Sequence, residues 1–200
     1  MYLDLSDEEL MELAAEGDEM AFQELAGRVR PSVRAFLSRL GCGVAEAEDL
    51  AQEALIRLWL HRRSYRSGKP LHPYLLTIAK NAFLSHVQRH GSQAAPVALP
   101  SEPSALDRLL LRAGWQVEGP EAEVMGRYRE YRLSRAVADL PTGERLVFVL
   151  KHHEGLRYGE IAALLGIAEG TVKSRMFRAV RMLRQALPDL DPEGPQEEAQ

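Results

Sequence analysis

The segment 154–184 constrains the fold of this chain more than any other, because it holds two helical patterns on either side of one glycine. Apolar residues recur at helical spacing before Gly166, and a second apolar stripe runs through residues 172–187. Gly166 can adopt the left-handed backbone that ends a helix, so the pattern predicts a helix, a tight turn and a second helix. Helices joined in this way place the second one in the major groove of DNA.

The second of these helices carries side chains suited to reading DNA. Between residues 171 and 184 it contains five Lys or Arg residues and no acid. Arg can grip guanine with two hydrogen bonds, Lys and Ser suit phosphates or bases, and Phe can touch a thymine methyl group. A solvated basic helix on a small bundle is the alternative, but the preceding helix and glycine turn favour DNA binding. The candidate DNA-contacting residues, here called the recognition set, are Thr171, Lys173, Ser174, Arg175, Phe177, Arg178 and Arg181.

The motif EGLRYGEIAALLGIAEGTVKSRMFRAVRMLR at 154–184 resembles region 4 of bacterial RNA polymerase sigma factors, specifically the extracytoplasmic-function (ECF) group. The preceding segment AVADLPTGERLVFVLKHHEG continues the resemblance. In that family the recognition set would read the promoter −35 element. Other helix-turn-helix regulators share parts of the motif, so the rest of the chain has to decide between the two classes.

Composition predicts an all-α fold, because runs rich in Val, Ile and Thr are nearly absent. The single cysteine, Cys42, excludes an internal disulfide and a four-cysteine zinc site. The adjacent histidines His152 and His153 point in different directions on a helix and lack a ligand partner at suitable spacing, so no metal is expected. No phosphate-binding glycine loop or nucleophile elbow is found, which argues against an enzyme and against a cofactor. No apolar run approaches the ~20 residues of a membrane span and no signal segment is recognised, so a cytoplasmic protein is expected.

The net charge of −4 conceals a strong segregation of charge along the chain. Residues 1–24 hold nine acids and no Lys or Arg, whereas residues 54–90 hold seven Lys or Arg and no acid. Residues 127–187 hold twelve bases against six acids. Two basic blocks in an acidic chain predict two contacts with one polyanion.

The chain is predicted to form two small helical domains joined by a flexible linker. Residues 91–120 are rich in Pro and Gly, as linkers are, and residues 188–200 form an acidic tail with the composition of a disordered segment. Resemblance assigns residues 1–90 to sigma region 2 and residues 121–187, with the helix-turn-helix, to sigma region 4. Inside the first domain, Pro31 is expected to end or redirect a helix.

The best-formed amphipathic helix is predicted at 46–61. Its expected apolar stripe consists of Leu50, Ala54, Ile56, Leu58 and Trp59. A core helix with a solvated acidic start would explain the pattern, but AEDLAQEALIRLW at 47–59 also resembles the sigma helix that docks on the largest subunit of RNA polymerase. By this resemblance the candidate polymerase-binding residues, here called the docking set, are Asp49, Gln52, Glu53 and Arg57.

A basic loop at 64–72 and the helix after it have the composition of a single-stranded nucleic-acid site. Aromatic rings can stack on unpaired bases while cations hold the phosphates, although an exposed basic helix with one interfacial Tyr is the alternative. PLHPYLLTIAKNAFLSHVQR at 70–89 resembles the sigma segment that reads and melts the −10 element, with Tyr74 where a Trp is usual and Ser85 where an Asp is usual. The candidates, here called the opening set, are Tyr65, Arg66, Lys69, His72, Tyr74, Lys80, Asn81 and Arg89.

The resemblance covers about residues 17–90 and 129–187, in the order found in the family. It implies a sigma factor that binds core RNA polymerase, recognises promoter DNA and opens it at initiation. An anti-sigma protein is a further expected partner, because sigma factors of this group are often held by one. A helix-turn-helix regulator that does not engage polymerase explains residues 154–184 but leaves the helices at 46–61 and 73–90 without a role.

Overall fold

The structure is a computed structural model that describes residues 2–90 and 120–188, so most of the predicted linker and acidic tail lies outside the described residues. The chain divides into two compact units, residues 1–38 with 42–93 and residues 39–41 with 94–200. We call them the N-terminal and C-terminal units and describe each by itself. The predicted domain limits at residues 90, 120 and 187 stay predictions.

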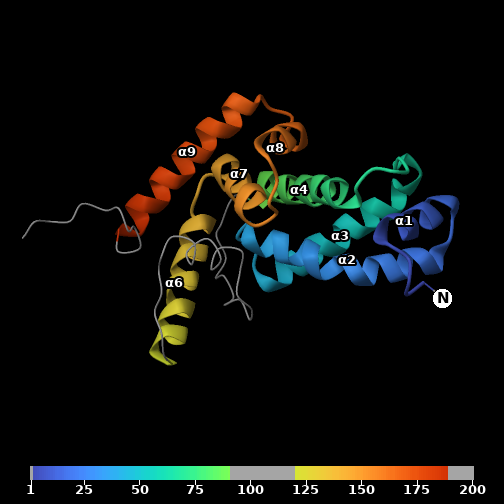
Figure 1. Cartoon of the computed structure of the whole chain (residues 1–200), viewed down its shortest axis with the longest axis horizontal. Coiled ribbons are helices and arrows are strands. Elements are labelled where there is room, and N and C mark those ends of the chain that lie inside the picture. Colours follow the sequence, from blue (N-terminus) through green and yellow to red (C-terminus); the bar gives the residue numbers. More distant parts are fainter. Residues whose placement is uncertain (1, 91–119, 189–200) are drawn as a thin grey trace, which may run out of the picture. The chain divides into compact units, whose positions relative to one another are not determined.

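Every regular element in the described residues is a helix, which confirms the all-α prediction (Figure 1). The N-terminal unit contains α1 (Asp7–Glu16), α2 (Glu19–Arg39), α3 (Val44–Leu60), the short 3-10 helix η1 (Arg62–Ser64) and α4 (Leu71–His90). The C-terminal unit contains α6 (Pro120–Ala138), α7 (Thr142–His152), α8 (Tyr158–Leu165) and α9 (Glu169–Ala186).

Local sequence signals set the first two helices. The Ser6 side chain accepts a hydrogen bond from the Glu9 amide, and the Glu9 carboxylate accepts one from the Ser6 amide at 2.7 Å, which forms a capping box. Gly17 ends α1 in the left-handed conformation, with φ of 112°. The Asp18 carboxylate then accepts a hydrogen bond from the Ala21 amide at 3.0 Å and starts α2.

The expectation that a helix ends or is redirected at Pro31 is wrong, because α2 runs without interruption from Glu19 to Arg39. Proline removes one backbone hydrogen bond from a helix and crowds the carbonyl four residues earlier. Here apolar residues on both sides of Pro31 are buried on one face, including Val29 and Val33, and Phe36 is fully buried. Tertiary packing over the whole length of α2 therefore outweighs the local cost of the proline.

The predicted apolar stripe of the 46–61 helix is buried at three of its five residues. Leu50, Ala54 and Leu58 of α3 are buried, whereas Ile56 is 52% exposed. The helix faces α4, and the Glu46 carboxylate of α3 contacts the His86 imidazole of α4. Ile56 lies off this contact because residues 50, 54 and 58 recur every four positions, and residue 56 falls halfway round the helix from them.

In the C-terminal unit, α8 and α9 form the predicted helix-turn-helix around Gly166, whose φ is 67° (Figure 1). The Ile167 amide donates to the Ala162 carbonyl at 3.1 Å and closes the turn. Ile161 of α8 and Val172 of α9 are fully buried, and Met176 is 6% exposed. This shared core fixes the face that α9 turns inwards.

Two neighbouring residues of α9 provide a test of this orientation. Met176→Ala should lower the free energy of unfolding of the C-terminal unit by about 2–5 kcal/mol, because it empties a packed site. Phe177 is 70% exposed, so Phe177→Ala should change this free energy by less than about 0.5 kcal/mol. Urea denaturation followed by circular dichroism measures both. Equal losses for the two variants would mean that α9 is rotated about its axis.

Candidate nucleic-acid interface

The recognition set lies on the side of α9 that faces away from the core. Val172, Met176, Ala179 and Leu183 are buried, and between them α9 presents Lys173, Ser174, Phe177, Arg178 and Arg181 as exposed residues. Thr171 and Arg175 are half-buried at the margin of this face. All seven residues of the recognition set therefore lie on one helix, five of them fully at the surface.

Three cations of the recognition set already have partners within the C-terminal unit. A guanidinium nitrogen of Arg178 lies 3.1 Å from a carboxylate oxygen of Glu144, whose side chain is only 13% exposed. The guanidinium of Arg175 packs on the start of α7, where a Cβ placed on Gly143 would lie 3.1 Å from the Arg175 Cζ atom. The ammonium of Lys173 lies 2.8 Å from the Glu169 carboxylate. The hydrogen bond to this carboxylate and the negative charge of Glu169 raise the pKa of Lys173.

The contacts of Arg175 and Arg178 with α7 are features that the sequence did not predict. Gly143 could have been noticed as a residue that leaves space for a neighbour, but nothing in the sequence identifies that neighbour. In the structure these contacts fix the two guanidinium groups relative to α7. Side chains held in this way lose less conformational freedom when they bind a ligand.

Part of the opening set comes together in the loop between η1 and α4. The rings of Tyr65 and Tyr74 have centroids 5.8 Å apart. The Tyr65 hydroxyl donates a hydrogen bond to the Lys69 carbonyl, and the hydroxyls of Tyr74 and Ser64 are 3.2 Å apart. Burial, followed by the charges of two glutamates of α1, raises the pKa of Tyr65. Arg66, Lys69 and His72 of the same loop are exposed.

The rest of the opening set lies further along α4. Lys80 belongs to the opening set but is only 8% exposed, and burial lowers the pKa of its ammonium group. Asn81 and Arg89 are exposed. Because a helix rises about 1.5 Å per residue, Arg89 is roughly 22 Å along α4 from Tyr74. The structure thus brings Tyr65, Lys69 and Tyr74 together but not the whole set.

The docking set follows the outer side of α3. Asp49 and Gln52 are exposed, and Glu53 and Arg57 are half-exposed and form an ion pair with each other. Beside them lies a groove between the start of α2 and α3, which the sequence did not predict. It is lined by Glu19, Phe22, Gln23, Gln52, Leu55, Ile56 and Trp59. Ile56 is the sequence signal for this groove, because helical periodicity places it away from Leu50, Ala54 and Leu58 and leaves an apolar side chain exposed.

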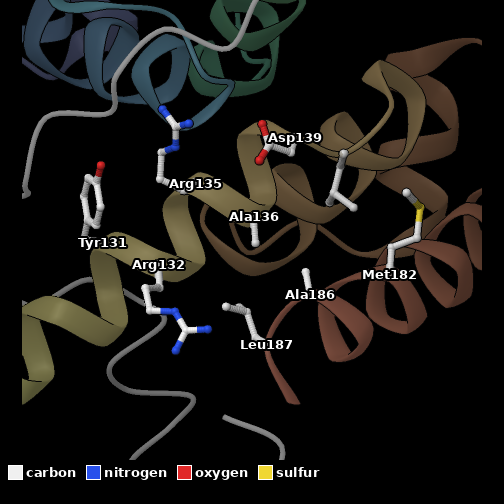
Figure 2. Close-up of a pocket in the computed structure, with 9 residues that line it drawn as sticks. Tyr131, Arg132, Arg135, Ala136, Asp139, Met182, Ala186 and Leu187 are labelled. Atoms are coloured by element: carbon white, nitrogen blue, oxygen red, sulfur yellow. The ribbon is translucent and has the colours of Figure 1, made fainter. Parts of the chain in front are cut away.

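A pocket of about 340 Å³ lies between α6 and α9 of the C-terminal unit. Figure 2 shows Met182 and Ala186 of α9, and Leu187 directly after it, opposite residues of α6 that include Tyr131 and Arg135. Its lining combines an apolar floor with arginines, and no residue of the three predicted sets lines it.

Two further searches concern the described residues alone. Within residues 2–90 and 120–188, no helix combines the length and the apolar character needed to cross a bilayer. In the same ranges no three His, Cys, Asp or Glu side chains are grouped so that they could hold a metal ion.

Known protein families account for both units. The family model of sigma-70 region 2 matches residues 25–93, and the model of sigma-70 region 4 matches residues 131–183. The first match contains the docking and opening sets, and the second contains the recognition set.

Individual relatives match nearly the whole chain. The RNA polymerase sigma-H factor of Pseudomonas aeruginosa is 28% identical over 187 residues, covering 92% of this chain and 95% of that protein. The ECF RNA polymerase sigma-E factor of Escherichia coli K12 is 28% identical over 178 residues, covering 88% and 91%. The ECF RNA polymerase sigma factor SigW of Bacillus subtilis is 29% identical over 176 residues, covering 87% and 92%.

Solved structures show the same fold. CnrH in complex with the cytosolic domain of CnrY matches with a TM-score of 0.61 at 23% identity, covering 92% of this chain and 98% of that one. The sigma factor RpoE in complex with the anti-sigma factor NepR, from Bartonella quintana, matches with a TM-score of 0.60 at 26% identity, covering 84% and 96%.

Proposed function

The chain belongs to the extracytoplasmic-function group of RNA polymerase sigma factors, and from this premise we propose how its own residues perform that function. The protein binds core RNA polymerase through α3, reads the −35 element of a promoter through α9, and captures an unstacked base of the −10 element at the loop before α4. It performs no chemistry of its own, because polymerase makes the phosphodiester bonds, so it is not an enzyme.

The proposal is supported by two different surfaces in one chain, each with the composition that suits a nucleic acid. The exposed face of α9 suits the major groove of closed duplex DNA. The Tyr65–Tyr74 pair, beside a loop that carries the exposed Arg66 and Lys69, suits an unpaired base. A helix-turn-helix regulator uses only the first kind of surface, whereas a protein that opens its site uses both.

Two further parts of the proposal concern cellular context. An anti-sigma protein is a partner, supported by the similar sigma factor RpoE, whose structure contains the anti-sigma factor NepR. The protein acts in the cytoplasm, where core polymerase and promoter DNA are found.

Polymerase binding should depend on the docking set and on the groove beside it. Asp49→Lys with Glu53→Lys should weaken binding to core polymerase, because it reverses two charges on the outer side of α3. Ile56→Ser should weaken it by about 1–3 kcal/mol, because a partner that fills the groove would bury this side chain. Fluorescence titration with labelled core polymerase measures each affinity.

The matched control for the charge reversal is Asp4→Lys with Glu16→Lys, which makes the same charge change at exposed positions outside α3. Circular dichroism should show that each variant remains helical. If the α3 variant binds core polymerase as tightly as the control variant, α3 is not the docking helix.

Reading of the −35 element should depend on Arg178. Arg178→Ala should reduce discrimination at one or two base pairs by about 1–3 kcal/mol, because Arg can contact guanine through two hydrogen bonds. Arg181→Ala, further from the start of α9, should instead weaken all sequences alike, as loss of a phosphate contact does. Competition binding against a panel of substituted −35 duplexes measures both. Equal losses on cognate and scrambled duplexes would assign Arg178 to the DNA backbone.

Opening of the −10 element is the test of the proposal as a whole. A fluorescent base analogue in the non-template strand should brighten when wild-type protein and core polymerase open the promoter. Tyr65→Ala with Lys69→Ala should bind core polymerase and −35 DNA normally but open slowly, since unstacking costs a few kcal/mol that contacts with the loop must offset. Tyr65→Phe keeps the ring and should open almost normally. The proposal fails if wild-type protein opens none of the promoters that it binds.

A further inference from the structure

Two carboxylates of α1 hold the loop that contains Tyr65. A Glu8 carboxylate oxygen accepts a hydrogen bond from the Leu71 amide at 3.0 Å. One turn further along α1, the Glu12 carboxylate accepts a hydrogen bond from the Ser67 hydroxyl. Ser67 lies in the turn that the Lys69 amide closes on the Arg66 carbonyl, and Leu71 is the first residue of α4, so α1 holds the loop at its turn and at its C-terminal end.

The Glu8 contact satisfies a need that the local sequence leaves open. Helix α4 begins at Leu71 directly after Pro70, which offers no side-chain acceptor, and its first turn contains no acid. The first amide groups of a helix lack partners within the helix and are usually capped by a nearby Ser, Thr, Asp or Asn. Here the cap comes from Glu8, which is 63 residues earlier in the chain.

The helix that carries the two carboxylates is packed on the core of the N-terminal unit. Leu10 and Met11 are fully buried on the opposite face of α1, which fixes its rotation. The segment before α1 is held by Arg28 of α2, whose guanidinium donates to the Leu5 carbonyl at 2.7 Å and to the Tyr2 carbonyl at 2.9 Å. Glu8 and Glu12 therefore project from a helix whose position is set by contacts outside the loop.

Both glutamates are electrostatically close to Tyr65, since their charges help to raise the pKa of its hydroxyl. Acids beside a surface that binds a polyanion repel it, so their presence needs a compensating benefit. Ordering the loop before DNA arrives is such a benefit, because a preformed site loses less conformational entropy on binding.

We propose that Glu8 and Glu12 are positioning residues that preform the 64–72 loop for capture of an unstacked base. This inference rests on the proposed function of the loop. It extends the base-capture site to α1, which precedes the residues matched by the region 2 family model. The glutamates act through the loop and do not contact the base themselves.

The experiment uses full-length protein with core polymerase and the fluorescent −10 promoter described above. Glu8→Ala with Glu12→Ala should slow opening roughly tenfold, because two hydrogen bonds that order the loop are lost. Binding to core polymerase and to −35 duplex should not change. Glu16→Ala is the matched control, since Glu16 is one turn beyond Glu12 at an exposed position, and it should open like wild type.

Two additional measurements separate loop positioning from a general loss of stability. Glu12→Gln keeps an oxygen that can accept the hydrogen bond from the Ser67 hydroxyl. With Glu8 unchanged, the Glu12→Gln protein should therefore open the promoter at nearly the wild-type rate, whereas the Glu12→Ala protein should open it more slowly. The pKa of Tyr65, followed by phenolate absorbance against a Tyr65→Phe blank, should fall in Glu8→Ala with Glu12→Ala. Burial contributes most to the raised pKa of Tyr65, so circular dichroism first has to show that the double variant is as folded as wild type.

The outcomes distinguish the inference from the proposed function. If wild-type protein opens no promoter, the proposed function fails. If wild-type protein opens the promoter and the double variant opens it equally fast or faster, the positioning role is wrong. Unchanged titration of Tyr65 in a folded double variant would also overturn it. If α4 frays in that variant, Ser67→Ala tests the loop from its own side, and normal opening there contradicts the role of Glu12.

Discussion

The burial of one face of α9 is the interaction on which the C-terminal surface depends. Val172 and Met176 pack into the core shared with α8, and this fixes which residues of the basic helix reach solvent. A helix of this kind gains most of its stability from tertiary packing of its apolar face and little from propensity. The same packing that stabilises the helix-turn-helix therefore also aims its cations. In this unit the buried face of α9 contributes stability, and its exposed face carries the recognition set.

Helix existence, the position of the turn at Gly166 and most of the core could be predicted from the sequence. These features depend on periodicity and on glycine, which act over a few residues. Pro31 shows where local rules fail, because α2 continues through it when both flanking segments are buried on the same face. Ile56 shows a second limit, since an apolar residue two positions from a stripe can look like part of it and yet lie on the other side of the helix.

The polar contacts of the candidate sites were less accessible to sequence reasoning. Chemistry and family resemblance predicted which residues belong to the recognition and opening sets. They did not predict which side chains of the same chain contact those residues. Glu8 caps a helix that starts 63 residues later, and Glu144 of α7 pairs with Arg178 of α9. Such pairs depend on how the helices pack, and side chains far apart in sequence carry no local pattern that announces them. Lys80 belongs to the same class, because its burial is a property of the folded unit.

The ion pair between Arg178 and Glu144 also affects how DNA binding responds to salt. When a cationic side chain neutralises a phosphate, the counterion that accompanied the phosphate is released, and affinity falls as the salt concentration rises. Arg178 is already neutralised by a carboxylate that is only 13% exposed. It brings little net positive charge to the interface, although it still offers directional hydrogen-bond donors. The slope of log affinity against log salt concentration should therefore correspond to fewer neutralised phosphates than α9 has basic residues. The part of the affinity that Arg178 supplies should persist at high ionic strength.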